Sequence, residues 1–180
     1  MQQIIIKYIT KLNKRTEMRT RLFICIFFVS SLFTAFSQAP YKNSIGGILG
    51  FTQGFSYKTF PVEDFAFQVD LGFRVSHYAL GLDINANLMY EKPIQNGFYW
   101  FIGGGLSLGP AFGGIVYDDN FPIGFKIGAN AIGGVEYKFP QIPLTLQADI
   151  RPGISFFVGN GFFHPRFDYS FLNLSARYTF

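Results

Sequence analysis

Residues 65–75 read FAFQVDLGFRV, and this stretch decides the fold. Every second residue from Phe65 to Val75 is apolar, whereas the residues between them are polar or small. Successive side chains of a β-strand point to opposite faces, so this alternation predicts a strand with one apolar and one polar face.

The same alternation recurs along most of the chain after residue 43. It is clear in four further segments: Leu80–Glu91, Lys126–Phe139, Leu144–Arg151 and Leu172–Phe180. A long series of two-faced strands without helical segments between them favours an antiparallel all-β fold.

Residues 93–117 need a separate decision, because these 25 residues carry no charge and could pass for a membrane helix. Each glycine in a helix interior costs about 1 kcal/mol and a proline about 3 kcal/mol, and the segment holds seven glycines and Pro110. At period two, Phe98, Trp100 and Ile102 share one face, and Tyr99 and Phe101 share the other. We therefore expect a strand here, followed by a loop.

The connections between the predicted strands come in two lengths. Three are tight: Pro61–Asp64, Lys92–Gly97 and Phe139–Pro143. Two are longer and rich in Gly and Asp or His: Gly109–Pro122 and Gly159–Phe167. Short turns at one end and long loops at the other are typical of an up-and-down barrel in an outer membrane.

Strand parity then sets the number of strands. Counting back from Phe180, an even number requires a first hairpin, with one strand over Ser44–Phe51, a turn at Thr52–Gly54 and a second strand over Phe55–Phe60. The sequence thus predicts an all-β fold, an eight-stranded antiparallel up-and-down transmembrane β-barrel.

Composition and charge reduce the number of possible function classes. The chain has 180 residues, of which 49% are hydrophobic and 14% charged, against roughly 25% charged in an ordinary soluble domain. The formal charge is +4, but residues 1–37 hold six basic residues and one glutamate, so residues 38–180 carry −1. A nearly neutral domain lacks the basic surface that nucleic acid requires, and we expect no nucleic-acid partner.

The first 37 residues resemble a secretion leader. Residues 22–36 form an uncharged apolar run of 15 residues behind Arg19 and Arg21, short of the roughly 20 that a spanning helix needs. Ala35 and Ser37 supply the small residues of a cleavage site. We expect residues 1–37 to be a leader region that contains a signal peptide, with Met18 as the true initiator and cleavage after Ser37. Residues 38–180 would then form the barrel domain. An uncleaved anchor segment is the alternative.

Cys25 is the single cysteine and lies inside that apolar run. Lipoprotein acylation would require a small residue before it, where the chain has Ile24. A chain cleaved after Ser37 would therefore contain no disulfide, no thiolate metal site and no cysteine nucleophile.

Alternation alone does not say which face is outside, because a soluble lipocalin-like barrel also alternates, with its apolar residues inside. The leader and the terminal residues favour the membrane, where strands cross only as a closed barrel with its apolar face toward lipid. The polar residues would then fill the lumen of an eight-stranded barrel, which is just wide enough for side chains. Six cations face five anions: Lys58, Arg74, Lys126, Lys138, Arg151 and Arg177 with Asp70, Asp83, Glu91, Glu136 and Asp149.

Ion pairing between these side chains predicts a plugged lumen instead of a water-filled pore. Aromatic residues near the strand ends are candidates for the girdles that mark the two membrane interfaces. They are Tyr57, Tyr90, Trp100, Tyr137 and Tyr178.

The closing residues FLNLSARYTF resemble the C-terminal signal that outer-membrane barrels present to their assembly machinery, with Phe180 as its last residue. The segments GFSYKTF and GVEYKFPQIPLTLQADIRPG are similar to the small outer-membrane β-barrel domain family, of the OmpX and OmpA-barrel type. The resemblance covers residues 44–180. It implies a place in the outer membrane, contact with lipid and recognition by the assembly machinery, and it brings no catalytic residues with it.

Candidate catalytic chemistry is sparse. His77, which follows Ser76, and His164 are the two histidines, and no spacing motif ties either to a serine. The lumenal carboxylates could be a glycosidase pair or a cation site, but each has a basic neighbour in the alternation, which favours ion pairing. We expect no enzyme, no catalytic, cofactor-binding or metal site residues and no cofactor.

The favoured function is a structural or surface-interaction protein of the cell outer membrane, present as a monomer. An unidentified extracellular partner would meet the loops Phe112–Phe121, with Asp118 and Asp119, and Gly159–Phe167. A narrow channel for small solutes is the alternative, and an outer-membrane lipid-modifying enzyme is a third hypothesis.

Overall fold

The computed structural model describes residues 39–50, 52–76, 79–112, 124–159 and 162–180. The predicted leader, Met18, Cys25 and His77 lie outside these residues. No helix in the described part of the chain has the length and apolar character that crossing a membrane would require.

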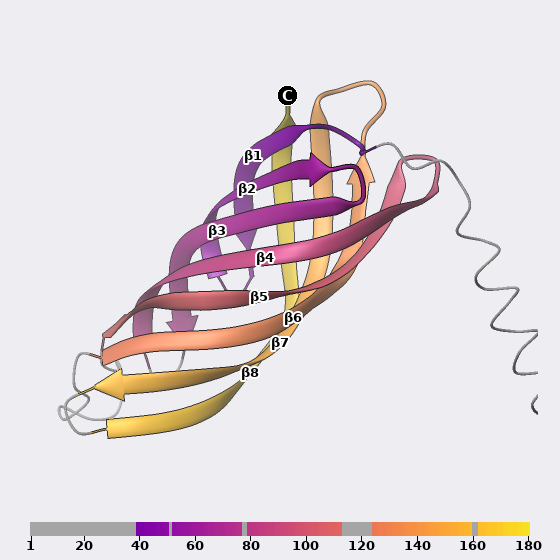
Figure 1. The fold of residues 1–180 in the computed structure, drawn as a ribbon. Helices are drawn as coiled ribbons and strands as arrows, with labels where there is room; N and C mark the ends of the chain where they lie inside the picture. Colours follow the sequence, from indigo (N-terminus) through magenta and orange to yellow (C-terminus); the bar gives the residue numbers. More distant parts are fainter. Residues whose placement is uncertain (1–38, 51, 77–78, 113–123, 160–161) are drawn as a thin grey trace, which may run out of the picture. The chain divides into compact units, whose positions relative to one another are not determined.

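The described residues form a closed barrel of eight strands, each antiparallel to its neighbours in sequence, with β1 pairing with β8 to close it (Figure 1). The strands are β1 (Asn43–Leu49), β2 (Thr52–Val62), β3 (Phe65–Ser76), β4 (Ala79–Gln95), β5 (Phe98–Phe112), β6 (Gly124–Lys138), β7 (Leu144–Gly159) and β8 (Phe162–Thr179). The prediction of an all-β, eight-stranded antiparallel up-and-down barrel is confirmed.

The two ends of the barrel differ. The turn end carries the connections at 63–64, 96–97 and 139–143 together with both ends of the barrel chain, whereas the loop end carries those at 50–51, 77–78, 113–123 and 160–161. At the turn end, Asn43 and Phe180 exchange backbone hydrogen bonds of 3.0 and 2.9 Å, which join the first strand to the end of the last.

The turn predicted over Lys92–Gly97 is tighter than expected. β4 continues to Gln95, and only Asn96 and Gly97 form the connection, with φ values of 51° and 85°. A two-residue hairpin turn that matches strand twist requires positive φ at both positions, which an Asn-Gly pair adopts readily.

The first hairpin turns earlier than predicted. β1 ends at Leu49 and β2 begins at Thr52, so the predicted strand end at Phe51 and turn at Thr52–Gly54 are wrong. Gly50 adopts a φ of 149°, and a Cβ there would lie 2.7 Å from the Leu172 carbonyl oxygen. Only glycine accommodates this combination, so Gly50 is suited to follow the end of β1.

Of the loop predicted over Gly109–Pro122, residues 109–112 belong to β5 and residues 113–122 lie outside the described residues, whereas the loop predicted over Gly159–Phe167 is mostly strand. β5 runs to Phe112, and β8 starts at Phe162, where Gly159–Phe167 was expected to be a loop. Within that segment Phe163 pairs with Val158 and Phe167 with Ile154 of β7. Pairing with β7 therefore continues through most of this segment, whose glycines had indicated a loop.

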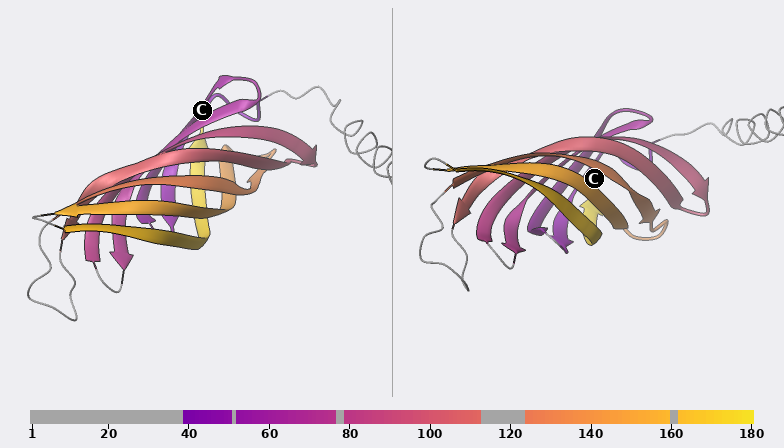
Figure 2. Two further views of the ribbon diagram at one scale, coloured as in Figure 1. Left: turned by 60° about the horizontal axis from the view of Figure 1, so that its bottom comes forward. Right: turned by 90° about the horizontal axis from the view of Figure 1, so that it is seen from below.

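A bulge divides β8 into two parts. Asp149 pairs with Asn173, but Arg151 pairs with Ser170, so β8 has one more residue than β7 between these pairs. A bulged strand bends, and β8 changes direction between its two halves (Figures 1 and 2).

Candidate functional site

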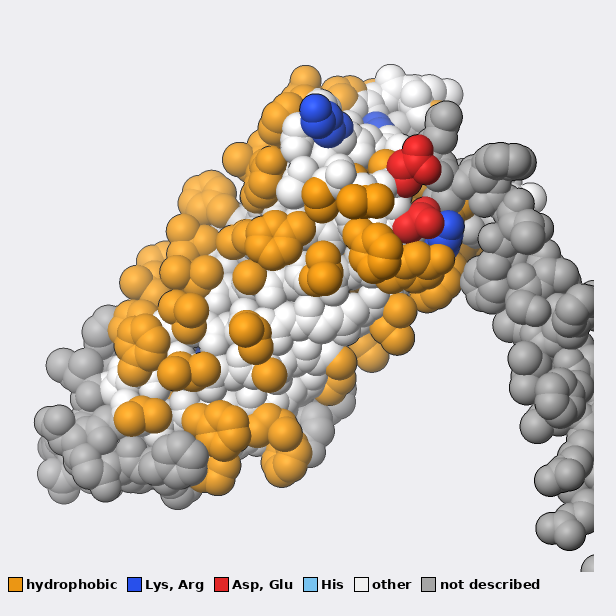
Figure 3. All heavy atoms as spheres, viewed as in Figure 1, with side chains coloured by type: hydrophobic (Ala, Val, Ile, Leu, Met, Phe, Trp, Pro, Cys, Tyr) orange, Lys and Arg blue, Asp and Glu red, His pale blue; other side chains and the backbone are white. Residues whose placement is uncertain are grey.

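Polar and apolar side chains are distributed in this barrel in the opposite way to a soluble protein. Among the described residues, 22 polar or charged side chains are buried, against six hydrophobic ones. Large apolar side chains are instead exposed on the outer surface of every strand, and they are spread over the visible face of the barrel (Figure 3). The predicted orientation of the two faces is confirmed, and a lipocalin-like apolar interior is excluded.

The lumen near the turn end holds a buried four-residue charge cluster. Lys58 Nζ lies 2.5 Å from Glu91 Oε2 and 2.8 Å from Glu136 Oε2, and Arg177 Nη2 lies 2.7 Å from the same Glu136 oxygen. The residues come from β2, β4, β6 and β8, so the cluster spans the lumen. All four side chains are at most 1% exposed.

A second cluster lies around Arg151, on β7. Its Nη1 lies 2.6 Å from Asp70 Oδ2, and its Nε lies 2.6 Å from Asp149 Oδ1. Gln147 and Asn173 donate further hydrogen bonds of 2.7 and 3.1 Å to Asp149. The Asp149 carboxylate is thus stabilised by two side-chain amides in addition to the Arg151 guanidinium.

A third cluster lies toward the loop end. Arg74 Nη2 and Nη1 lie 3.0 Å from Asp83 Oδ2 and 2.9 Å from Asp168 Oδ2. Lys126 Nζ lies 2.8 Å from Asp83 Oδ1. Asp168 was missed by the sequence analysis, since it follows a segment that was expected to be a loop.

Lys138 does not belong to the lumen, contrary to prediction. Its Nζ donates to the carbonyl oxygens of Phe139 and Ile142, at 3.1 and 3.0 Å. The adjacent turn offers these acceptors at the barrel rim, so the side chain bends toward the turn. The other ten residues of the predicted lumenal set lie in the three clusters.

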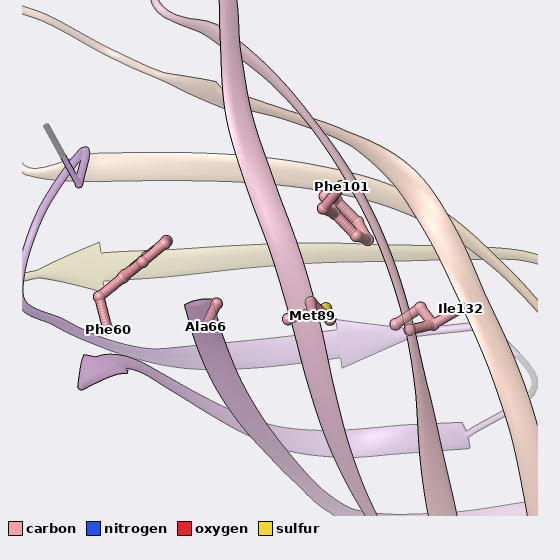
Figure 4. Packing of buried hydrophobic residues seen from close by; sticks show 5 residues of the cluster. All are labelled: Phe60, Ala66, Met89, Phe101 and Ile132. Atoms are coloured by element: carbon pink, nitrogen blue, oxygen red, sulfur yellow. The ribbon is translucent and has the colours of Figure 1, made fainter. Parts of the chain in front are cut away.

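A cluster of buried apolar side chains, the apolar floor, lies in the lumen toward the turn end. It consists of Phe60, Ala66, Met89, Phe101 and Ile132, which point toward one another from β2 to β6 (Figure 4). Ala39 and Tyr41, ahead of β1, pack against this floor, and the Tyr41 and Phe60 rings meet edge to face at 5.2 Å between centroids.

Electrostatic contacts couple the floor to the first charge cluster. Lys58 Nζ lies 5.2 Å from the ring centroids of both Phe60 and Phe101, within the range of a cation–π interaction. Burial raises the pKa of the Tyr41 hydroxyl well above its usual range, and the nearby Lys58 ammonium offsets this only in part.

The lumen contains a small polar cavity next to the third cluster. Its volume is about 30 Å³, and its lining includes Arg74, Asp83, Asn85, Asn130 and Asp168. This is room for roughly one water molecule. The cavity is far too small to hold an organic substrate.

The aromatic residues predicted to form girdles gather at one end. Tyr90 packs against Trp100 at 6.1 Å, Tyr137 against Phe98 at 4.6 Å, and Tyr178 against Phe180 at 6.4 Å between centroids. These contacts, like the exterior charged residues Lys42, Glu63, Asp64 and Lys92, lie at the turn end.

The structure describes only part of the remaining candidate residues. His164 lies on β8, where its backbone pairs with Phe157, and not in a loop as expected; its side chain lies outside the described residues, as do Asp118 and Asp119. Within the described part of the chain, no group of three or more His, Cys, Asp or Glu residues could hold a metal ion.

Comparison with known proteins identifies no relative, since no family model, curated protein or solved structure matches this chain.

Proposed function

We propose that this chain is an integral outer-membrane β-barrel protein with a closed lumen, which acts as a monomer in a structural or surface-interaction role and not as an enzyme. One observation carries the proposal: the apolar side chains are outside and the ionic ones inside. Water would disfavour so large an apolar surface, whereas lipid would match it.

The turn-end boundary of the apolar surface supports a place in a bilayer. Paired aromatic rings and exterior charges occur together at the turn end, as they do at the interfaces of membrane barrels. In bacterial barrels the short turns face the periplasm, so the loop end would face outward and meet an extracellular partner.

The three charge clusters favour a lumen filled by side chains over the alternative of a narrow channel. Lys58, Arg177 and Arg151 each join strands that are not neighbours, and Lys58 and Arg177 are fully buried. An ion crossing the lumen would have to displace these pairs and the apolar floor beneath them, at a large cost in free energy.

The C-terminus supports recognition by the barrel-assembly machinery. The Phe180 side chain is 61% exposed, although its backbone is tied to Asn43. A terminal aromatic ring on the outer rim of the turn end is accessible to a periplasmic partner, in keeping with the resemblance to the OmpX and OmpA-barrel type.

Migration on a denaturing gel and conductance test the proposal together. Boiled and unboiled samples of the membrane fraction should migrate differently, because a closed barrel resists detergent until heated. The purified protein should then give no steady single-channel steps in planar bilayers. A chain found dissolved in the periplasm would refute the membrane assignment, and steady steps would favour the channel.

A further inference from the structure

Residues that precede the barrel wall lie in the lumen at the turn end. Ala39 and Tyr41 pack against the apolar floor, and residues 39–42 belong to no strand. The wall itself starts only at Asn43, whose backbone exchanges two hydrogen bonds with Phe180. We call residues 39–41 the strap. No strand pair of the barrel depends on it.

Tyr41 points into the lumen with its hydroxyl group first. The residue as a whole is half-buried, but its hydroxyl oxygen is fully buried. Its ring meets the Phe60 ring edge to face at 5.2 Å between centroids, and its hydroxyl is close enough to Lys58 and Glu136 to interact electrostatically with both. The side chain therefore lies between the turn-end mouth of the lumen and the first charge cluster.

Backbone hydrogen bonds hold the chain at one end of the strap only. The carbonyl oxygen of Lys42 accepts hydrogen bonds from Phe60 N and Thr59 Oγ1, at 3.0 and 3.3 Å. Within the described part of the chain, residues 39–41 form no backbone–backbone hydrogen bond. Side-chain packing thus holds the strap in the lumen, and Lys42 is the point about which it can swing.

The closed position leaves buried oxygen atoms without hydrogen bonds. The Tyr41 hydroxyl and the Oε1 atoms of Glu91 and Glu136 have no hydrogen-bond partner among the described residues. Burial of the Tyr41 ring favours the closed position, whereas each buried polar atom without a partner opposes it. Withdrawal of the ring would give water access to these oxygens, so the preference for the closed position should be small.

We propose that the strap is a removable seal: the Tyr41 ring closes the turn-end mouth of the lumen and can leave it while all eight strands stay paired. Opening would admit water as far as the first charge cluster and no further. The inference goes beyond the proposed function and does not depend on it, because the seal would open in a detergent micelle as well as in a bilayer.

Labelling of single cysteines in the folded barrel, with Cys25→Ser as background, tests whether the seal opens. Ala66→Cys places a thiol in the floor, at a side chain that is 0% exposed. Ser175→Cys places one in the lumen beyond the first charge cluster, two residues from Arg177 on β8, at a side chain that is 3% exposed. Its labelling rate measures general unfolding.

Iodoacetamide, which is small and uncharged, should modify Ala66→Cys several-fold faster than Ser175→Cys. The modified barrel should still migrate differently before and after heating, because only the strap has moved. Equal rates at the two cysteines would show that the floor is reached only when the barrel unfolds, and the seal would not be removable.

Substitution of Tyr41 identifies the sealing group. Tyr41→Ala should accelerate the modification of Ala66→Cys by about tenfold or more, since the local opening no longer has to break the ring packing, and it should leave Ser175→Cys unchanged. Tyr41→Phe keeps the ring and removes the unpaired hydroxyl, so it should give no acceleration. Tyr178→Ala removes a ring from the outer face at the same end. It is the matched control and should also give none.

Three results with these variants would overturn the proposal. If Tyr41→Ala has no effect, Tyr41 does not shield the floor. If it accelerates both cysteines equally, Tyr41 stabilises the whole barrel and is not a local seal. If Tyr41→Phe accelerates labelling as much as Tyr41→Ala, the ring is not what closes the mouth. Should Ala66→Cys prevent folding, Met89→Cys gives the same test, because Met89 pairs with Ala66 and also lies in the floor.

Discussion

Arg74 and Asp168 lie 94 residues apart in the sequence, yet Arg74 Nη1 is 2.9 Å from Asp168 Oδ2. The pair joins β3 to β8 where β2 begins, since Arg74 pairs with Thr52, and within the described residues no backbone pairing connects β3 with β8. Side chains thus bridge two strands that no described backbone ladder joins.

Asp168→Asn should destabilise the barrel, because Arg74 would lose its ion pair with Asp168 while that with Asp83 remains. The side chains are mostly buried, so we expect the free energy of unfolding to fall by roughly 1 to 3 kcal/mol. Denaturant titration in phospholipid vesicles, followed by the fluorescence of the single tryptophan, Trp100, measures this change.

Asp64→Asn is the control, since Asp64 pairs with Lys92 at the turn end, where the pair is more exposed. Exposed pairs contribute about 0 to 1 kcal/mol. If both substitutions had equal effects, Arg74 and Asp168 would not bridge β3 and β8 in the way the geometry indicates.

Lys58→Met should have a larger effect, because it leaves two buried carboxylates, Glu91 and Glu136, facing each other with Arg177 as the remaining cation. Removing one partner from a buried ion cluster costs about 3 to 5 kcal/mol. The same titration gives the value.

The double variant Lys58→Met/Glu91→Gln separates a lost pair from a general packing defect. Neutralising Glu91 removes a charge that Lys58→Met left uncompensated, so the two effects should be clearly non-additive. Simple additivity would show that Lys58 and Glu91 do not interact in the folded barrel.

Ile102→Arg and Ile94→Arg compare two depths on the outer surface. The two isoleucines are 58% and 59% exposed, but Ile102 lies within β5 and Ile94 beside the tight turn. Arginine costs about 2 to 4 kcal/mol at the bilayer midplane and about 0 to 1 near the interface. Equal tolerance of both substitutions in vesicles would contradict the lipid-facing assignment.

Tyr41 should make stability depend on alkaline pH. Its pKa is raised by burial in the folded barrel, while in the unfolded chain it is about 10. Only the unfolded state loses the proton as the pH first rises above that value, so the free energy of unfolding should decline there. The decline should be smaller in Tyr41→Phe, and identical pH profiles would contradict burial of the hydroxyl.

The sequence determined the number of strands and the two faces of most of them, but not the bounds of the first hairpin or the start of β8. Period-two alternation is a local property, since each side chain points away from its neighbours on the chain. Phe101, which the alternation placed on the face opposite Phe98 and Trp100, lies in the floor.

Tertiary structure decided which charges meet. The sequence predicted pairing between close neighbours, but Lys58 pairs with Glu136, 78 residues away, because the stagger at which strands close into a barrel sets which residues lie across the lumen. Lys138 lies outside the lumenal clusters because its ammonium group binds carbonyl oxygens of the adjacent turn. Asp168 faces the lumen because the bulge in β8 shifts the alternation by one residue. Alternation shows which face a residue occupies; only closure of the barrel shows what it faces.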